Sequence, residues 1–286
     1  MTHTDARQEE IERISRTGVS RSRRGALAAG AAIGAGLLLG GRAEAAGQPP
    51  RSAADEIQDI LNTALTAERL SITFYYTVLT TPAVMHDPRL GGPSADPNNP
   101  GLPPGGDPSN VKYMQAALDA EVKHAAALEQ ASAVSPYTRF YFPAGTFDGL
   151  GASTQPNSVL GRLDILETAL VGGYAAGAGI CLRLGRPDIA TTIAQIMGVE
   201  AEHRVLGRVI GGVDAVVNLA TEIPPISSVA EAARALRPFL TGQAGVGFSG
   251  RPTPPVPLPT PARTRRVVGR YPTHLVRRFL QGGGNG

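Results

Sequence analysis

Four long stretches of the chain repeat apolar residues with helical spacing, and the stretches between them do not. Apolar positions three or four residues apart form one continuous face of an α-helix, and such a face is normally buried. The pattern predicts helices over about 52–80, 111–134, 158–184 and 189–210, and a shorter fifth helix near 228–240. Four long helices without a strand pattern between them predict an all-α protein built on an antiparallel four-helix bundle.

The segments outside these helices are of three kinds. Residues 81–109 are dense in Pro, Gly, Asn and Asp and predict a long loop. Residues 135–157 contain the aromatic run YTRFYFPAGTF, so we expect this segment to pack on the bundle. From Gly242 onward Pro, Gly and Arg dominate, which is typical of an extended, polyproline-like tail without its own core.

Each of the four long helices places a glutamate inside its apolar face. A buried, unpaired carboxylate costs on the order of several kcal/mol, and four that converge would also repel one another. The nearest cations, Arg69, Lys123 and Arg204, each fall one step off the apolar face. On two of the helices a histidine follows the glutamate by three residues, and so lies on the same side of the helix. The order along the chain is Glu68, Glu121 with His124, Glu167, and Glu200 with His203.

Two divalent cations would neutralise this arrangement. Four carboxylates carry a charge of about −4, and each neutral imidazole adds one nitrogen ligand. One Glu-x-x-His motif is a weak signal, but its alternation with lone glutamates over four helices is a strong one. The alternative is that Glu68 and Glu167 are half-buried and solvated, and that His124 is an ordinary core histidine.

Two tyrosines repeat the same spacing. Tyr75 and Tyr174 each follow a lone glutamate by seven residues, which predicts that the two halves of the bundle are copies of one hairpin. Their hydroxyls either hydrogen-bond the glutamates or quench radicals near a metal, or the rings simply pack in the core with a polar tip.

The order Glu…Glu-x-x-His…Glu…Glu-x-x-His resembles the ferritin-like di-iron carboxylate superfamily, with sites of the bacterioferritin and rubrerythrin type. The segments AERLSITFYY and RFYFPAGTF are most similar to its secreted, desiccation-related branch. The resemblance covers about residues 52–212 and implies a ferritin-like bundle that binds two iron ions, or manganese in their place. The resemblance implies that Glu68 and Glu167 are terminal ligands and that Glu121 and Glu200 bridge the two metals. It also implies that His124 and His203 each cap one metal.

Two kinds of function follow from such a centre. The first is redox chemistry in stress protection, either Fe(II) oxidation by O₂ or peroxide or manganese-catalase-like peroxide dismutation. The second is a non-catalytic module of the cell envelope that protects against desiccation and in which the metals are structural. The sequence leaves open whether the protein is an enzyme, and it is compatible with a homo-oligomer.

The C-terminal tail differs in charge from the body of the chain. Residues 46–250 carry 13 Lys and Arg against 19 Asp and Glu, whereas residues 251–286 carry seven Arg and no acidic residue. The tail therefore either wraps the acidic body or contacts an anionic surface, and we expect no nucleic-acid partner. The single cysteine, Cys181, excludes thiolate metal sites, which need several cysteines.

The N-terminal residues have the pattern of a signal peptide. Arg23 and Arg24 precede a weakly apolar Ala/Gly/Leu run that ends at the A-x-A site Ala43–Ala45. The paired arginines resemble a twin-arginine signal, which predicts export to the periplasm, cell envelope or medium; an uncleaved anchor is the alternative. The predicted organisation is a signal peptide over 1–45, a bundle domain over 46–241 without a transmembrane helix, and a tail over 242–286.

Overall fold

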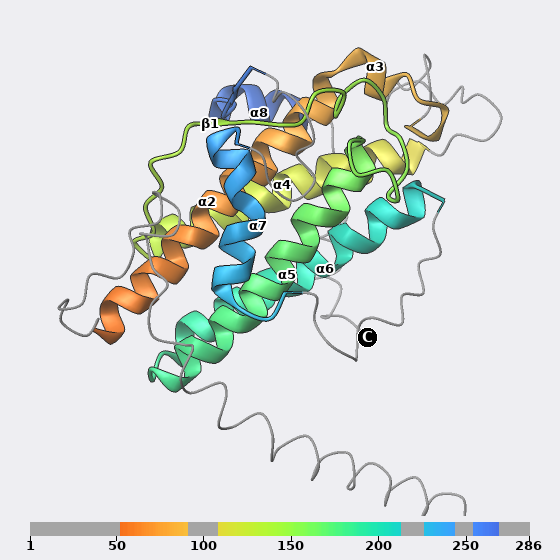
Figure 1. Cartoon of the computed structure of the whole chain (residues 1–286). Coiled ribbons are helices and arrows are strands. Elements are labelled where there is room, and N and C mark those ends of the chain that lie inside the picture. The colour runs from red at the N-terminus through yellow and green to blue at the C-terminus, as the bar shows by residue number, and fades with distance from the viewer. Residues whose placement is uncertain (1–51, 91–107, 213–225, 244–253, 269–286) are drawn as a thin grey trace, which may run out of the picture.

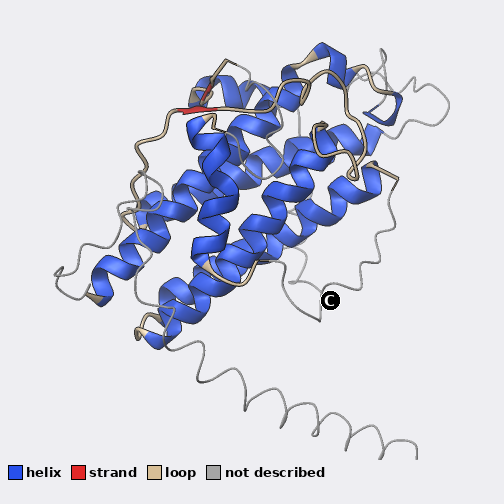
Figure 2. Cartoon of the chain, viewed as in Figure 1, coloured by secondary structure: helices blue, strands red, loops and turns tan. Residues whose placement is uncertain are grey.

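A bundle of four long helices forms the body of the protein (Figures 1 and 2). The computed structural model describes residues 52–90, 108–212, 226–243 and 254–268. The four helices are α2 (Ala53–Thr80), α4 (Pro108–Gln130), α5 (Val159–Arg183) and α6 (Pro187–Ile210). α2 packs on α4 and α5 packs on α6, and the two pairs meet where α2 contacts α5 and α4 contacts α6. The predicted all-α four-helix bundle is therefore confirmed.

The helices begin where the sequence places capping residues. Ser52, Ser158 and Ser228 are the N-caps of α2, α5 and α7 (Val229–Thr241), and each side chain accepts a backbone N–H three residues further on. This bond satisfies an N–H that has no partner within the helix. Between α5 and α6 the chain turns at Gly185, whose φ of 74° favours glycine.

The predicted bounds of α4 and α6 were wrong by up to four residues. α6 starts at Pro187, because proline suits the first turn of a helix. α4 ends at Gln130 because Ser132 takes a φ of 69° and redirects the chain onto α2. There the Ser132 carbonyl accepts a hydrogen bond from Gln58 Nε2 at 2.9 Å, and the Val134 N–H donates to Asn62 Oδ1 at 2.7 Å.

The first predicted loop is partly helical. It contains α3 (Pro82–Met85) and a 3₁₀ turn, η1 (Pro88–Leu90), with Val84 and Leu90 fully buried. Residues 91–107 of this loop lie outside the described residues.

The aromatic insert packs on the bundle, as predicted. Phe140 and Phe142 are fully buried, and the Phe142 ring lies 5.9 Å from Phe74 of α2 and 5.9 Å from Phe239 of α7. α7 crosses α5 in Figure 1. A Cβ at Gly172 of α5 would meet the Ile226 carbonyl oxygen at 2.4 Å, so glycine is needed where the chain enters α7.

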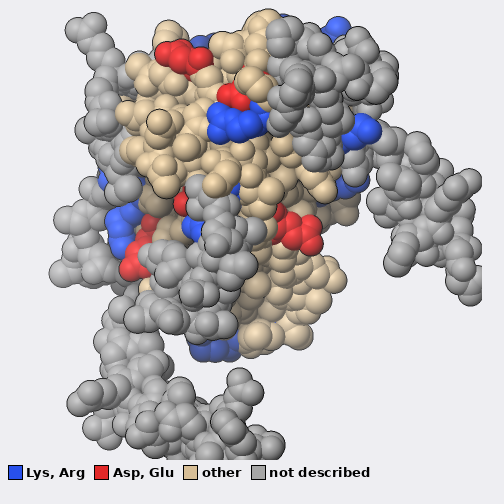
Figure 3. Space-filling model, turned by 90° about the vertical axis from the view of Figure 1, so that its right-hand side faces the viewer, with Lys and Arg blue, Asp and Glu red and all other residues tan. Residues whose placement is uncertain are grey.

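The C-terminal tail is more structured than predicted. β2 (Val256–Pro257) pairs antiparallel with β1 (Arg139–Phe140), and α8 (Pro261–Val268) packs against α2 and α4. Neutral groups make the contact: Thr264 is buried, and Gln115 Nε2 donates to the Val267 carbonyl at 3.0 Å. The exposed residues of α8 include its three arginines, Arg263, Arg265 and Arg266. On the face in Figure 3, charged side chains of both signs are scattered among neutral ones.

We expect Thr264→Arg to lower the free energy of unfolding by roughly 2 kcal/mol, because it forces a charge into the contact between α8 and the bundle. Thermal unfolding followed by circular dichroism measures the change. Ala262→Arg is the matched control, since Ala262 is exposed on the same helix. Equal melting temperatures for the two variants would show that α8 does not pack on the body in solution.

Among the described residues, α5 is the one helix long and apolar enough to cross a membrane by length and composition alone. Its environment here is that of a core helix. It contacts α2, α6 and α7, and it buries the side chains of Arg162 and Glu167 inside the protein.

Candidate metal centre

Six polar side chains converge inside the bundle, and all six are buried among apolar residues. The four glutamates are 0% exposed, and the histidines are 9% and 6% exposed. α2 and α5 each supply one glutamate, and α4 and α6 each supply a glutamate and a histidine three residues apart. Every site residue expected from the sequence is thus brought to one place: Glu68, Glu121, His124, Glu167, Glu200 and His203.

The six residues form two groups that share two glutamates. The first group is Glu68, Glu121, His124 and Glu200, and the second is Glu121, Glu167, Glu200 and His203. In each group, one ligand atom from every residue lies within 4.8 Å of the others. Glu121 and Glu200 belong to both groups, which is the arrangement required of carboxylates that bridge two cations.

The two oxygens of each shared glutamate face different histidines. Glu200 Oε1 lies 2.8 Å from His124 Nδ1, and Glu200 Oε2 lies 3.2 Å from His203 Nδ1. Glu121 Oε2 lies 3.7 Å from His124 Nδ1, and Glu121 Oε1 lies 3.1 Å from His203 Nδ1. Each histidine also approaches one unshared glutamate, Glu68 at 3.4 Å or Glu167 at 3.9 Å.

The donor atoms of this cluster fit two divalent metal ions. Five carboxylate oxygens have no hydrogen-bond partner among the described residues: both of Glu121, and one each of Glu68, Glu167 and Glu200. His124 Nδ1 also lacks one, because its contact with Glu200 does not have hydrogen-bonding geometry. Buried polar atoms are rarely left without partners, and carboxylate and imidazole donors together suit divalent iron or manganese.

The nearby cations are engaged elsewhere, as their positions off the apolar faces predicted. Arg69 pairs with Glu129 at 3.0 Å and donates to the Ser135 carbonyl. Lys123 pairs with Asp119 on its own helix. Arg204 lies 4.0 Å from Asp164. None of these three cations neutralises the buried glutamates.

Without metal, burial and the charges within the cluster shift the pKa values of Glu121, Glu167 and Glu200. Burial, followed by repulsion from Glu200, raises the pKa of both Glu121 and Glu167 well above the usual range. Burial also acts to raise the pKa of Glu200. The contacts of Glu200 with both histidines outweigh this effect and lower its pKa to about 2.

The pKa values of the two histidines are raised, although burial alone would lower them. Burial acts to lower the pKa of His124, yet its contacts with three glutamates raise it to about 12. The pKa of His203 is raised for the same reason, with Glu200 as its main partner. A metal ion therefore has to displace protons from the histidines and from Glu121 and Glu167.

Two tyrosines form hydrogen bonds between α2 and α5 to the unshared glutamates. Tyr75 of α2 donates a hydrogen bond to Glu167 Oε1 of α5 at 2.8 Å, and Tyr174 of α5 donates one to Glu68 Oε1 of α2. Burial and the nearby glutamate charges raise the pKa of both hydroxyls, so both remain donors. The hydrogen-bonding alternative for these tyrosines is thus confirmed. The sequence did not indicate that each tyrosine hydrogen-bonds the glutamate of the other helix. The equal offset of seven residues from glutamate to tyrosine was the available sign that the two tyrosines have equivalent positions.

We expect Tyr75→Phe to weaken metal binding by about 10–100-fold, because a residue that orients a ligand contributes about that much to affinity. Competition with a chromophoric chelator measures the change. Tyr76→Phe is the matched control: Tyr76 is half-buried beside Tyr75 and makes no hydrogen bond through its hydroxyl within the described residues. Equal affinities of the two variants would mean that Tyr75 only packs.

Comparison with known proteins agrees with this geometry. A protein-family model described as a ferritin-like domain matches residues 56–210, a segment that contains all six cluster residues and more than half of the chain. No curated protein and no solved structure shows a significant match.

Proposed function

Because the chain belongs to the ferritin-like family, we propose that its bundle binds two divalent metal ions at the buried Glu/His cluster. Glu68 and His124 hold one ion, Glu167 and His203 hold the other, and Glu121 and Glu200 bridge them. The observation that supports this assignment best is that the two four-residue groups share Glu121 and Glu200, with one oxygen of each turned toward either histidine.

We infer that the resident metals are iron, with manganese as the alternative, and that they support ferroxidase or peroxide-consuming activity in stress protection. When bound, a carboxylate-rich pair of ions with only two histidines supplies one-electron oxidation and reduction. The chain's own contribution is to hold the ligands and to exclude water. Tyr75 and Tyr174 fix the unshared carboxylates, and the buried glutamates and histidines give up protons as metal enters.

The second candidate is a structural role for the metals, in an envelope or desiccation-protection module. Complete burial of the four glutamates favours it, because ions at that position link all four helices while little of the site faces solvent.

The experiment that separates these functions begins with metal-free protein. Reconstitution with Fe(II) without oxygen, or with Mn(II), followed by desalting and elemental analysis, is expected to give two metals per chain. Fe(II) oxidation by O₂ and by peroxide, and peroxide loss with Mn(II), are then followed with excess reactant. Two metals with turnover support the redox function, and two metals without turnover support the structural one. Fewer than one metal per chain would contradict both.

We propose that residues 1–45 act as a twin-arginine signal peptide and that the exported protein starts at Ala46, followed by a bundle domain to about 241 and the tail from 242. The support is the Arg23–Arg24 pair and the A-x-A site, both outside the described residues. N-terminal sequencing of protein from the periplasm, envelope or medium tests the cleavage site.

A further inference from the structure

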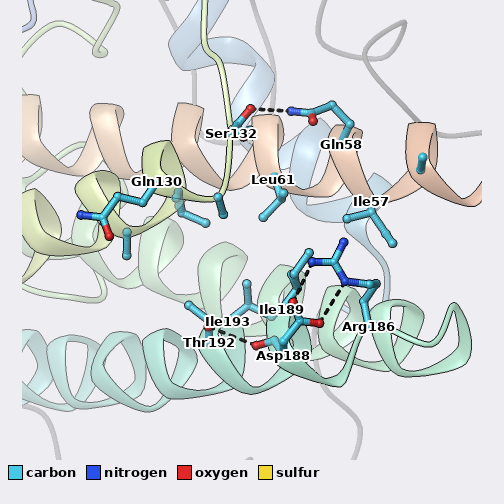
Figure 4. Close-up of a pocket in the computed structure, with 14 residues that line it drawn as sticks. Ile57, Gln58, Leu61, Gln130, Ser132, Arg186, Asp188, Ile189, Thr192 and Ile193 are labelled. Atoms are coloured by element: carbon cyan, nitrogen blue, oxygen red, sulfur yellow. Dashed lines mark hydrogen bonds and ion pairs between the residues drawn. The ribbon is translucent and has the colours of Figure 1, made fainter.

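A cavity of about 560 Å³ lies at the end of the bundle where α2 and α6 begin and α4 ends (Figure 4). Five apolar side chains form its walls, and all five are buried: Ile57, Leu61, Leu128, Ile189 and Ile193. Figure 4 shows Ile57 and Leu61 facing Ile189 and Ile193 across the opening. The cavity exists because Ala54, Ala127 and Ala131 also line it, and a methyl group leaves the space that a larger side chain would fill. Its volume lies within the range of roughly 300–1,000 Å³ that is usual for small-molecule sites.

The rim of this cavity is polar but carries no unpaired charge. Arg186 and Asp188 are the two charged residues that line it, and they pair with each other through two contacts of 2.7 and 3.0 Å. The other polar lining residues are neutral: Gln58, Gln130, Ser132 and Thr192. An ion that entered would lose hydration without gaining a free counter-charge, whereas a neutral polar group finds hydrogen-bond partners at the rim.

The cavity also points along the bundle toward the Glu/His cluster. Its wall residues Leu61, Leu128 and Ile193 each lie seven residues from a cluster glutamate, respectively Glu68, Glu121 and Glu200. Seven residues are two helical turns, so the wall and the carboxylates share one helix face at a separation of about 10 Å. Between them lies a buried layer that includes Leu65, Ala125 and Ile196.

We propose that this cavity binds a small neutral amphiphile, with an alkyl chain between the apolar walls and an uncharged head, such as a hydroxyl, at the rim. Because the walls are already buried, the gain comes mainly from removing the alkyl chain itself from water, which is favourable by about 25 cal/mol per Å² of apolar surface. The neutral head leaves the Arg186–Asp188 pair intact. This site is separate from the proposed metal function, because no cluster residue lines the cavity.

The test uses the full-length, metal-free protein and n-octanol as the probe, with binding measured by titration calorimetry. Octanoate and octylammonium provide the same chain with a negative or a positive head. Ala127→Phe places a ring in the cavity, and Ala126→Phe is the matched control on the same helix, since Ala126 is exposed and does not line the cavity. Octanol is expected to bind the wild-type protein. Its affinity for Ala127→Phe is expected to be about tenfold lower, and its affinity for Ala126→Phe is expected to stay within about twofold of wild type. Both charged probes are expected to bind about tenfold more weakly than octanol.

Three results would overturn the proposal: no binding of octanol to the wild-type protein, equal weakening in both phenylalanine variants, or tighter binding of octanoate or octylammonium than of octanol. If Ala127→Phe does not fold, a fluorescence experiment replaces it. The chain contains no tryptophan, so Thr192→Trp introduces a single indole at the rim. Its emission is expected to shift with octanol, while Leu182→Trp, at an exposed position outside the cavity, does not respond. A Thr192→Trp protein that does not respond to octanol would also overturn the proposal.

Discussion

Glu200→Gln is expected to remove both metal ions from the reconstituted protein. Glu200 belongs to both ligand groups, and its two oxygens lie beside different histidines at 2.8 and 3.2 Å. Glutamine keeps the shape of the side chain but loses the charge and replaces one ligand oxygen with an NH₂ group, which is not a metal ligand. The metal content should therefore fall from about two per chain to nearly zero, with an affinity loss above about 100-fold.

Glu68→Gln provides the contrast, because Glu68 belongs to one group only. We expect this variant to keep about one metal per chain after desalting. Glu202→Gln is the matched control, since Glu202 is exposed on α6 two residues from Glu200 and should leave both metals bound. A Glu200→Gln protein that keeps one metal would show that Glu200 does not bridge.

Raising the pH is expected to destabilise the metal-free protein and to strengthen its binding of metal. The raised pKa values of Glu121 and Glu167 favour folding in full below their ordinary value of 4.5, and this contribution is lost as pH rises toward the folded values. The contribution of His124 is complete below its ordinary pKa of 6.5 and is lost as pH rises toward about 12. His203 acts in the same direction. Glu200 has the opposite sign, because its stabilisation is present above pH 4.5 and is lost as pH falls toward about 2.

The metal-free protein should therefore be most stable near pH 4.5, since the contributions of Glu121 and Glu167 are lost above this pH and that of Glu200 is lost below it. We expect a loss of at least about 3 kcal/mol between about pH 6.5 and 8.5, since His124 alone would contribute nearly that much, measured by chemical unfolding in the presence of a chelator. His124→Gln should reduce this slope, and His86→Gln should not, since His86 is exposed and outside the cluster. A flat stability profile over this range would contradict the proposed protonation of the cluster.

Metal affinity should change in the other direction because the ligands bind in their deprotonated forms. Since more than one group gives up a proton, we expect affinity to rise by more than about tenfold per pH unit near neutrality. Chelator competition at several pH values measures the slope. Calorimetry in two buffers of different ionisation enthalpy gives the number of protons released.

The helices and the cluster could be predicted from the sequence because both depend on local spacing. Glu121 and His124 are three residues apart, so any helix there places them on one side, and the apolar residues around them fix that side as the inner one. The N-caps Ser52, Ser158 and Ser228 are local as well, since each accepts a backbone N–H only three residues further on.

Other features depend on contacts between distant segments, and their local sequence does not show them. α8 and β2 were predicted as an extended tail, because their partners, Gln115 and β1, are supplied by remote parts of the chain. The early end of α4 depends on Asn62 and Gln58 of α2. The cavity arises from three alanines, one in α2, one in α4 and one just after α4, and none of them is unusual in its own segment.

The crossed tyrosines have a consequence for how the protein assembles. They join residues 92 and 106 positions apart, and both bonds connect the α2–α4 hairpin to the α5–α6 hairpin. Each hairpin alone contributes three of the six cluster residues, so neither contains a complete four-residue group. The cluster comes into being only when the two hairpins dock. Metal uptake is therefore expected to occur after this late, long-range step of folding, and a bound metal would oppose separation of the two halves.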